Sequence, residues 1–518
     1  MKHALVLGIV SAAVSAFAAE VRLSAGNAEV AVAPDAPAAT RFAAGVMTEH
    51  LSKVLGGEVR CVTRPTAGKY TIFLGTNGWS RAEGLSPEAL RRDSFCIRVA
   101  ADRAFVAGCD DPKTDPAKVI AGGAGTPVLF ERATLFGVYD FLERYAGCRF
   151  YFPGELGTVV PRRESLVVPN GTTKVEPRFL ERSYPFYADG EYFEGTNRAF
   201  QLLSERKLNF FRQRMHTVYI PCCHGQSEFR LLRRFGKTHP EYFVQNADGT
   251  RRLDPNILFP GHLCQSSEVW NEIHDDIVSY VRGEGPEVRG MGSWNGKEKK
   301  QDWSIMAFRR PWVDVMPGDS FTRCHCPKCT AAYTDEKDYA TDLVWGRTVE
   351  LAQRLKDERV PIRITQMAYL PYGRVPDVEI PDNVDVMVAV SGPWTRRQQA
   401  EVERIRAWSE KLGHPVWIWT YPGKHGRMNI PDIPNPTPCA YGRYVKQMAP
   451  YVFGMYAEAN TDRWLYNYLT YYVFGKLCWN PDVDVEALLD EHFRLMFGAA
   501  AQPMADFIRQ LRGYGKSL

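Results

Sequence analysis

The sequence lacks a long internal apolar run, a block of basic residues and several widespread catalytic motifs. No segment after the N-terminus is apolar for the roughly 20 residues that a spanning helix needs, so we expect no membrane span in the mature protein. Its 64 basic and 60 acidic residues nearly balance, and no lysine or arginine block offers a nucleic-acid-binding surface. HExxH, GxSxG and complete phosphate-loop motifs are absent. Zinc-peptidase, serine-hydrolase and nucleotide-loop chemistry therefore have no support.

The N-terminus has the pattern of an export signal. Lys2 and His3 precede an apolar run over 4–14, and Ala16-Phe17-Ala18 has the small-x-small form of a cleavage site. A membrane anchor is the alternative, but the run is shorter than a spanning helix. We therefore expect residues 1–19 to be a signal peptide and the mature protein to be exported, either to the periplasm or outside the cell.

The rest of the chain predicts an α/β protein of three parts. Residues 20–170 combine strand-like segments with two amphipathic helices, over 42–55 and 133–146, and predict an α/β accessory domain. Over 178–480 short apolar runs alternate with helical stretches, as in a TIM-like (β/α) barrel. Residues 481–518 predict a helical tail. The barrel strands are expected at 183–187, 208–215, 312–316, 362–368, 384–390, 416–420 and 452–457.

Three phrases carry a family resemblance: ATLFGVYDFLERYAGCRFYFPGELGTVVP at 133–161, DVMPGDSFTRCHCPKC at 314–329, and GMYAEANTDRW through KLCWNPDVDVEALLDEHF at 454–493. They resemble a bacterial family described only as a domain of unknown function, whose N-terminal domain is similar to that of the family 67 α-glucuronidases. The resemblance implies an accessory α/β domain, a glycosidase-type barrel and a helical tail. It does not imply a particular reaction.

Polar and aromatic residues follow the expected barrel strands, where barrel enzymes place their catalytic groups. Asp319 and Glu458 are the candidate catalytic pair, because glycoside hydrolysis commonly uses two carboxylates. Asp319 could instead cap a turn after Gly318, and Glu458 could pair with Arg463. Aromatic faces stack on sugar rings, and a histidine can bind a hydroxyl. The candidate substrate-binding residues are His216, Tyr369, Trp394, Trp419, Tyr421 and Trp464.

Cys324, Cys326 and Cys329 form the one tight cysteine cluster among 12 cysteines. Three sulfurs in one short loop suit a structural zinc ion, which favours four nitrogen or sulfur ligands. The fourth ligand could be Cys264, His325 or His224. A disulfide, for example from Cys264, is the rival because export favours oxidation, and free thiols are the third alternative.

Together these patterns predict a glycoside hydrolase that needs no cofactor for catalysis. Its substrate is expected to be a polysaccharide or oligosaccharide, with uronic-acid glycans as one class. Two alternatives remain at this point: a carbohydrate-binding protein on a degenerate barrel, without turnover, and a metal-stabilised surface protein. An enzyme needs both acids facing each other, whereas a binding protein needs only the aromatic side chains.

Overall fold

A computed structural model describes most of the chain after the N-terminal segment. The described residues are 20–123, 128–184, 196–256, 262–291, 302–334, 337–393, 398–421, 438–458 and 464–514. The chain divides into two compact units, of which unit 1 comprises residues 1–122, 130–150 and 155–176, and unit 2 comprises 123–129, 151–154 and 177–518. Among the described residues, no helix is both long enough and apolar enough to cross a membrane.

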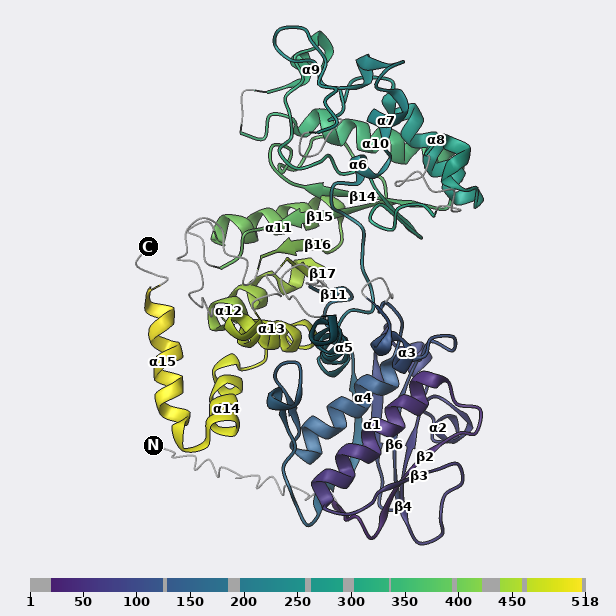
Figure 1. The fold of residues 1–518 in the computed structure, drawn as a ribbon, viewed down its shortest axis with the longest axis vertical. Coiled ribbons are helices and arrows are strands. Elements are labelled where there is room, and N and C mark those ends of the chain that lie inside the picture. The colour runs from purple at the N-terminus through teal and green to yellow at the C-terminus, as the bar shows by residue number, and fades with distance from the viewer. Residues whose placement is uncertain are drawn as a thin grey trace, which may run out of the picture. The chain divides into compact units, whose positions relative to one another are not determined.

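Unit 1 is a mixed sheet covered by two helices. Its six-stranded sheet has the order β10-β5-β6-β4-β2-β3, in which β3, β2, β4 and β6 are parallel and β5 runs antiparallel to both of its neighbours, β6 and β10. The strands are β2 (Ala28–Val32), β3 (Arg60–Val62), β4 (Tyr70–Leu74), β5 (Phe95–Val99), β6 (Arg103–Gly108) and β10 (Gly171–Val175). Helices α1 (Ala38–Leu55) and α4 (Ala133–Phe141) pack side by side against it (Figure 1). Gly56 ends α1 in the left-handed conformation with φ 69°, which glycine adopts without steric cost.

Small elements complete unit 1. They are β1 (Glu20–Leu23), which pairs with β9 (Leu166–Pro169), β7 (Arg149–Phe150), which pairs with β8 (Thr158–Val159), and the short helices α2 (Gly78–Ala82) and α3 (Pro116–Ala121).

Unit 2 is built on a curled, half-barrel sheet of seven strands in the order β11-β17-β16-β15-β14-β13-β12. The first six are parallel, and β12 is an antiparallel edge strand. Their bounds are β11 (Arg182–Ser183), β12 (Phe308–Arg309), β13 (Trp312–Asp314), β14 (Arg363–Ala368), β15 (Val384–Ala389), β16 (Val416–Thr420) and β17 (Val452–Ala457). Within the described residues β11 and β12 do not pair, so a closed TIM-like barrel remains a prediction.

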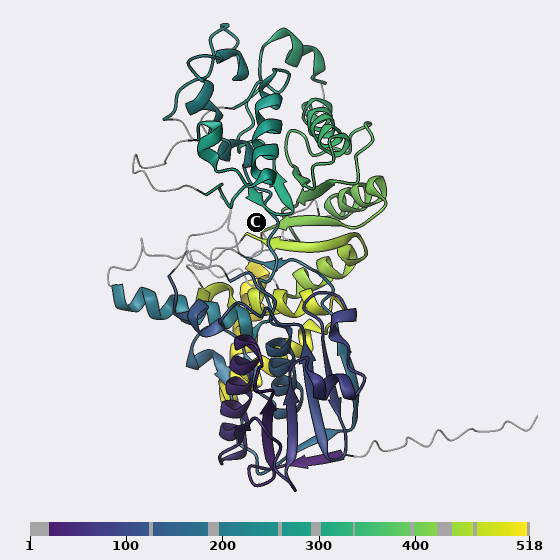
Figure 2. The same cartoon turned by 90° about the vertical axis from the view of Figure 1, so that its right-hand side faces the viewer.

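Helices alternate with these strands. Helices α10 and α11 pack along strands β14 to β16 (Figure 1 and Figure 2). The helices of unit 2 are α5 (Thr196–Arg212), α6 (Gly225–Glu228), α7 (Leu231–Phe235), α8 (Val269–Arg282), α9 (Pro327–Ala332), α10 (Thr341–Asp357), α11 (Gln398–Leu412), α12 (Pro438–Met448), α13 (Trp464–Trp479), α14 (Val485–Phe497) and α15 (Ala501–Tyr514).

The concave side of the sheet holds one apolar core. Alternate residues of each strand point into it, as the period of two requires, and residues from β17 and from the end of β13 share one cluster. Its buried members are Ile220, Cys222, Met316, Met367, Met387, Ala389, Trp417, Trp419 and Tyr456. Contact between side chains from separated strands shows that the sheet curls around them.

One predicted strand is wrong. Residues 208–215 were expected to be extended, but α5 continues through Arg212. The polar residues before Leu208 belong to the same helix, and Phe210 and Phe211 are its buried face. A short apolar run alone does not distinguish a buried strand from a buried helical turn. His216 therefore follows a helix and does not end a strand.

Candidate functional site

Asp319 and Glu458 follow two parallel strands of unit 2 at their carboxyl ends. Glu458 comes directly after β17, and its backbone N–H donates to the Thr420 carbonyl at 2.7 Å. Its Oε2 atom accepts a hydrogen bond of 2.9 Å from the indole Nε1 of Trp419. Asp319 lies in the loop after β13. Carboxyl ends of parallel strands share one edge of a sheet, which is where α/β proteins bind ligands.

Asp319 has two polar neighbours. The His224 Nε2 atom lies 3.2 Å from its Oδ1, and both side chains are partly exposed, at 25% and 40%. The Tyr369 hydroxyl donates a hydrogen bond to the same carboxylate. Burial raises the pKa of Tyr369, and the negative charges of Asp319 and Glu458 raise it further. The pKa of Tyr369 is thus raised by the charges of both acids.

Tyr421 gives the same result independently. Burial is the main cause that raises its pKa, followed by the charge of Glu458 and then by Tyr369 and Asp319. Tyr369 and Tyr421 both pack against the apolar cluster that contains Trp419, the hydrogen-bond donor to Glu458. The structure therefore links both tyrosines to the surroundings of Glu458, and it places Tyr369 and His224 beside Asp319.

The turn that carries His224 is fixed by a buried acid. Asp314 is fully buried on β13 and accepts hydrogen bonds from the backbone N–H of Cys223 at 2.6 Å and of Met316 at 2.8 Å. A Cβ atom at Gly225 would lie 2.2 Å from the Asp314 carbonyl oxygen, so only glycine fits there. These contacts place His224 over the end of β13.

The sequence did not predict two buried acids of this sheet, Asp314 and Glu181. Burial raises the pKa of Asp314 to about 7 and that of Glu181 to about 8. Glu181 precedes β11 and is 0% exposed. The signal for Asp314 was an acid at an alternate position of an apolar strand, in the run Trp312 to Met316. His224 had been considered only as a zinc ligand, and no local pattern predicted its contact with Asp319.

The other predicted binding residues are more dispersed. The Trp419 ring is only 7% exposed and packs on Tyr456 with ring centroids 4.2 Å apart, so little of its face is open to a sugar. The His216 ring stacks on Phe210 at 5.0 Å. Trp394 lies outside the described residues. Trp464 begins α13, but its side chain also lies outside them.

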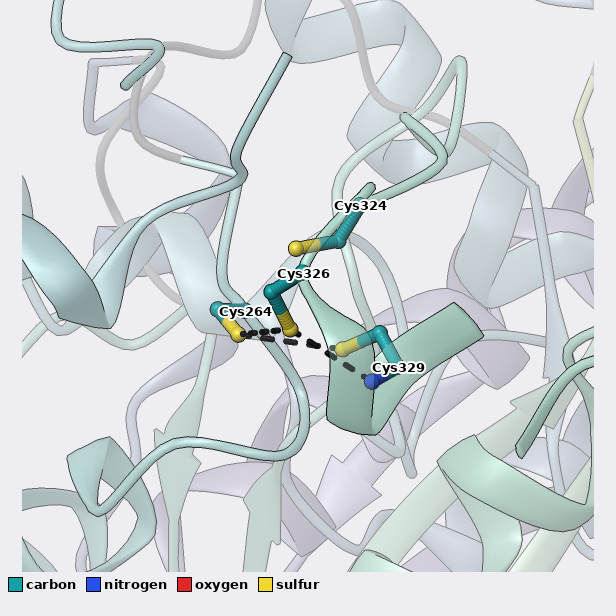
Figure 3. Close-up of side chains that lie close together, drawn as sticks. All are labelled: Cys264, Cys324, Cys326 and Cys329. Carbon is teal, nitrogen blue, oxygen red and sulfur yellow. Dashed lines mark hydrogen bonds between the residues drawn. The ribbon is translucent and has the colours of Figure 1, made fainter. Parts of the chain in front are cut away.

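The cysteine cluster is a second site in unit 2. Cys264 comes from one segment and Cys324, Cys326 and Cys329 from another, and their thiols converge (Figure 3). The four sulfur atoms lie within 4.8 Å of one another, and all four residues are buried. His325 is exposed, and His224 contacts Asp319.

Comparison with known proteins adds the fold relationship. Residues 307–510 match DUF4838, a domain of unknown function. No curated protein matches the chain. The resemblance of the N-terminal domain to family 67 α-glucuronidases remains a prediction.

Solved glycoside hydrolases are similar in structure. A 4-O-methyl-α-glucuronidase of family GH115, BtGH115A, with specificity for decorated arabinogalactans, has 12% identity and a TM-score of 0.51, over 95% of this chain and 62% of that one. A β-N-acetylhexosaminidase from Bacteroides fragilis NCTC 9343 has 12% identity and a TM-score of 0.42, over 95% of this chain and 93% of that one. This chain thus spans less than two thirds of the GH115 structure, and what it shares with that structure at this identity is the fold.

Proposed function

We propose that the protein is a glycoside hydrolase that uses Asp319 and Glu458 as its two carboxylates. The observation that carries the proposal is that Tyr369, which is hydrogen-bonded to Asp319, packs against the same cluster as Trp419, which donates a hydrogen bond to Glu458. Two carboxylates that follow parallel strands at the same edge of the sheet would supply the acid and the base or nucleophile that hydrolysis of a glycosidic bond commonly uses.

The surroundings of the two acids suggest different roles. Asp319 accepts a hydrogen bond from Tyr369 and lies beside the His224 ring. We assign Asp319 as the base or nucleophile. Glu458 is oriented by the Trp419 indole and is assigned as the group that protonates the leaving oxygen. Tyr369 and Tyr421 then bind sugar hydroxyls between the acids.

The proposed substrate is a polysaccharide or oligosaccharide. Uronic-acid glycans are a class to test first, because the GH115 structure is that of a 4-O-methyl-α-glucuronidase. No described group of the site calls for a metal or an organic cofactor in this reaction, since the two carboxyls supply both proton transfers.

A screen for released reducing sugar tests the proposal. The purified protein should cleave at least one member of a glycan panel, and Asp319→Asn and Glu458→Gln should each lower kcat by about 100-fold to 10,000-fold. Asp382→Asn is the matched control: its side chain is 80% exposed and it lies just before the start of β15, at the opposite end of the strands. Full activity in either site variant would refute the assignment. Glycan binding without turnover would instead support a carbohydrate-binding protein.

A further inference from the structure

We propose that Cys264, Cys324, Cys326 and Cys329 bind one Zn²⁺ ion as a tetrahedral structural site. Zinc–sulfur bonds are about 2.3 Å long, which places the sulfurs of a tetrahedral site about 3.8 Å apart. The sulfur of Cys264 lies 3.5 Å from that of Cys326 and 3.7 Å from that of Cys329. The cluster therefore has the dimensions that a zinc ion needs.

The alternatives fit less well. A disulfide needs sulfur atoms about 2.05 Å apart, and all 12 cysteines, every one of them among the described residues, are free. The group that could hold the ion contains four cysteines and no carboxylate or histidine. Four buried sulfurs leave no open coordination position for water or substrate, so the ion is structural and does not take part in catalysis.

Hydrogen-bond donors surround the sulfurs, as a thiolate site requires. Four thiolates around Zn²⁺ carry a net charge of −2, which must be offset in a buried place. The backbone N–H of Gln245 donates to the Cys324 sulfur at 3.3 Å, and that of Cys329 donates to the Cys326 sulfur at 3.4 Å. The Ser266 hydroxyl lies 3.0 Å from the Cys329 sulfur.

The ion would join two segments that are distant in the sequence. The segment before Cys264 and the loop after β13 already touch: the His325 N–H donates to the Gln245 carbonyl at 2.8 Å, and Arg252 donates to the Thr322 hydroxyl at 2.9 Å. Leu343 of α10 packs on the cluster. Zinc would therefore join the loop to the segment that carries Cys264, with Leu343 packed against the site.

The same loop carries Asp319, five residues before Cys324. By restricting the loop, the zinc site helps to hold Asp319 near His224 and Tyr369. Only this positioning role rests on the proposed function. Metal binding itself does not depend on any catalytic activity and can be measured separately.

Elemental analysis of the full-length protein, expressed with zinc and dialysed, tests the proposal. We expect about one zinc per chain. Cys324→Ser should lose the metal, whereas Cys61→Ser, which changes an exposed cysteine of unit 1, should keep it. Trypsin should cleave after the exposed Lys328 faster in Cys324→Ser and in chelator-treated parent protein than in untreated parent or in Cys61→Ser.

The parent protein decides the outcome even if Cys324→Ser does not fold. Absence of zinc would overturn the proposal, as would iron in its place. A disulfide among the four cysteines, detected by mass spectrometry without reduction, would also overturn it. Zinc present with no glycan cleavage would leave the metal site standing and would count against the proposed function alone.

Discussion

Replacing Glu181 by glutamine should stabilise unit 2, and the gain should increase with pH. Glu181 is completely buried, and its Oε1 accepts one long hydrogen bond of 3.4 Å from the Ile220 N–H. Its Oε2 has no hydrogen-bond partner among the described residues. Burial therefore dominates and raises its pKa to about 8, although the charge of Arg309 partly opposes the shift. Glutamine keeps the acceptor oxygen and has no charge to desolvate.

The magnitude and its sign follow from proton linkage. The Glu181 pKa rises from an ordinary value of 4.5 to about 8, which at about 1.4 kcal/mol for each pH unit corresponds to about 5 kcal/mol. Below pH 4.5 the Glu181 carboxyl is protonated in both the folded and the unfolded state, so it does not lower the free energy of unfolding. As the pH rises, only the unfolded chain releases the proton, so the parent loses stability until about pH 8, with about 3 kcal/mol lost by pH 7.

Urea unfolding at pH 5, 6.5 and 8 measures this effect. Tryptophan fluorescence reports unit 2, because 11 of the 12 tryptophans lie in it and only Trp79 lies in unit 1. The parent and Glu181→Gln should differ little at pH 5 and by a few kcal/mol at pH 8. If the variant is instead less stable at pH 8, Glu181 is ionised in the folded state and paired with Arg309, and the reasoning from burial is refuted.

Two further predictions concern residues next to Glu458 and His224. Trp419→Phe keeps a ring in the core but removes the 2.9 Å hydrogen bond to Glu458. Losing a hydrogen bond to a neutral carboxyl costs about 0.5–1.5 kcal/mol, so kcat should fall about 2-fold to 10-fold, and unchanged kcat would show that this bond does not orient the acid. Gly225→Ala would place Cβ 2.2 Å from the Asp314 carbonyl oxygen and should lower both Tm and activity, whereas Gly346→Ala in α10, with nothing within 4 Å, should be neutral or stabilising; equal Tm values for the two variants would contradict the close packing.

The sequence predicted the central strands of the sheet well. The predicted bounds 416–420 and 452–457 are those of β16 and β17, because parallel strands buried on both faces are continuous apolar runs. The run at 208–215 failed for the same reason, since a buried helical turn is equally apolar. The antiparallel edge strand β12 has only two residues, which is too short to give a periodic pattern.

The site depended on contacts that no local pattern records. Cys264 could be named as a candidate ligand, but its approach to Cys326, which lies 62 residues away, is a property of the folded chain. Asp314 and Glu181 were missed because burial, and not residue type, gives them raised pKa values. Conversely, Trp419 has the residue type of a sugar platform, but the curl of the sheet buries its ring in the core.

The curvature of the unit 2 sheet controls the gap between the two acids. Along the sheet, β17 and β13 are separated by four strand spacings, an arc of about 19 Å at about 4.8 Å each. The straight chord between the acids is shorter than that arc by an amount that depends on how tightly the strands bend around the core. Met316, Met367 and Met387 line the inside of the bend, and methionine is the most adaptable apolar side chain. A change of interior volume there could alter which glycosidic linkage fits without replacing any residue that touches the sugar.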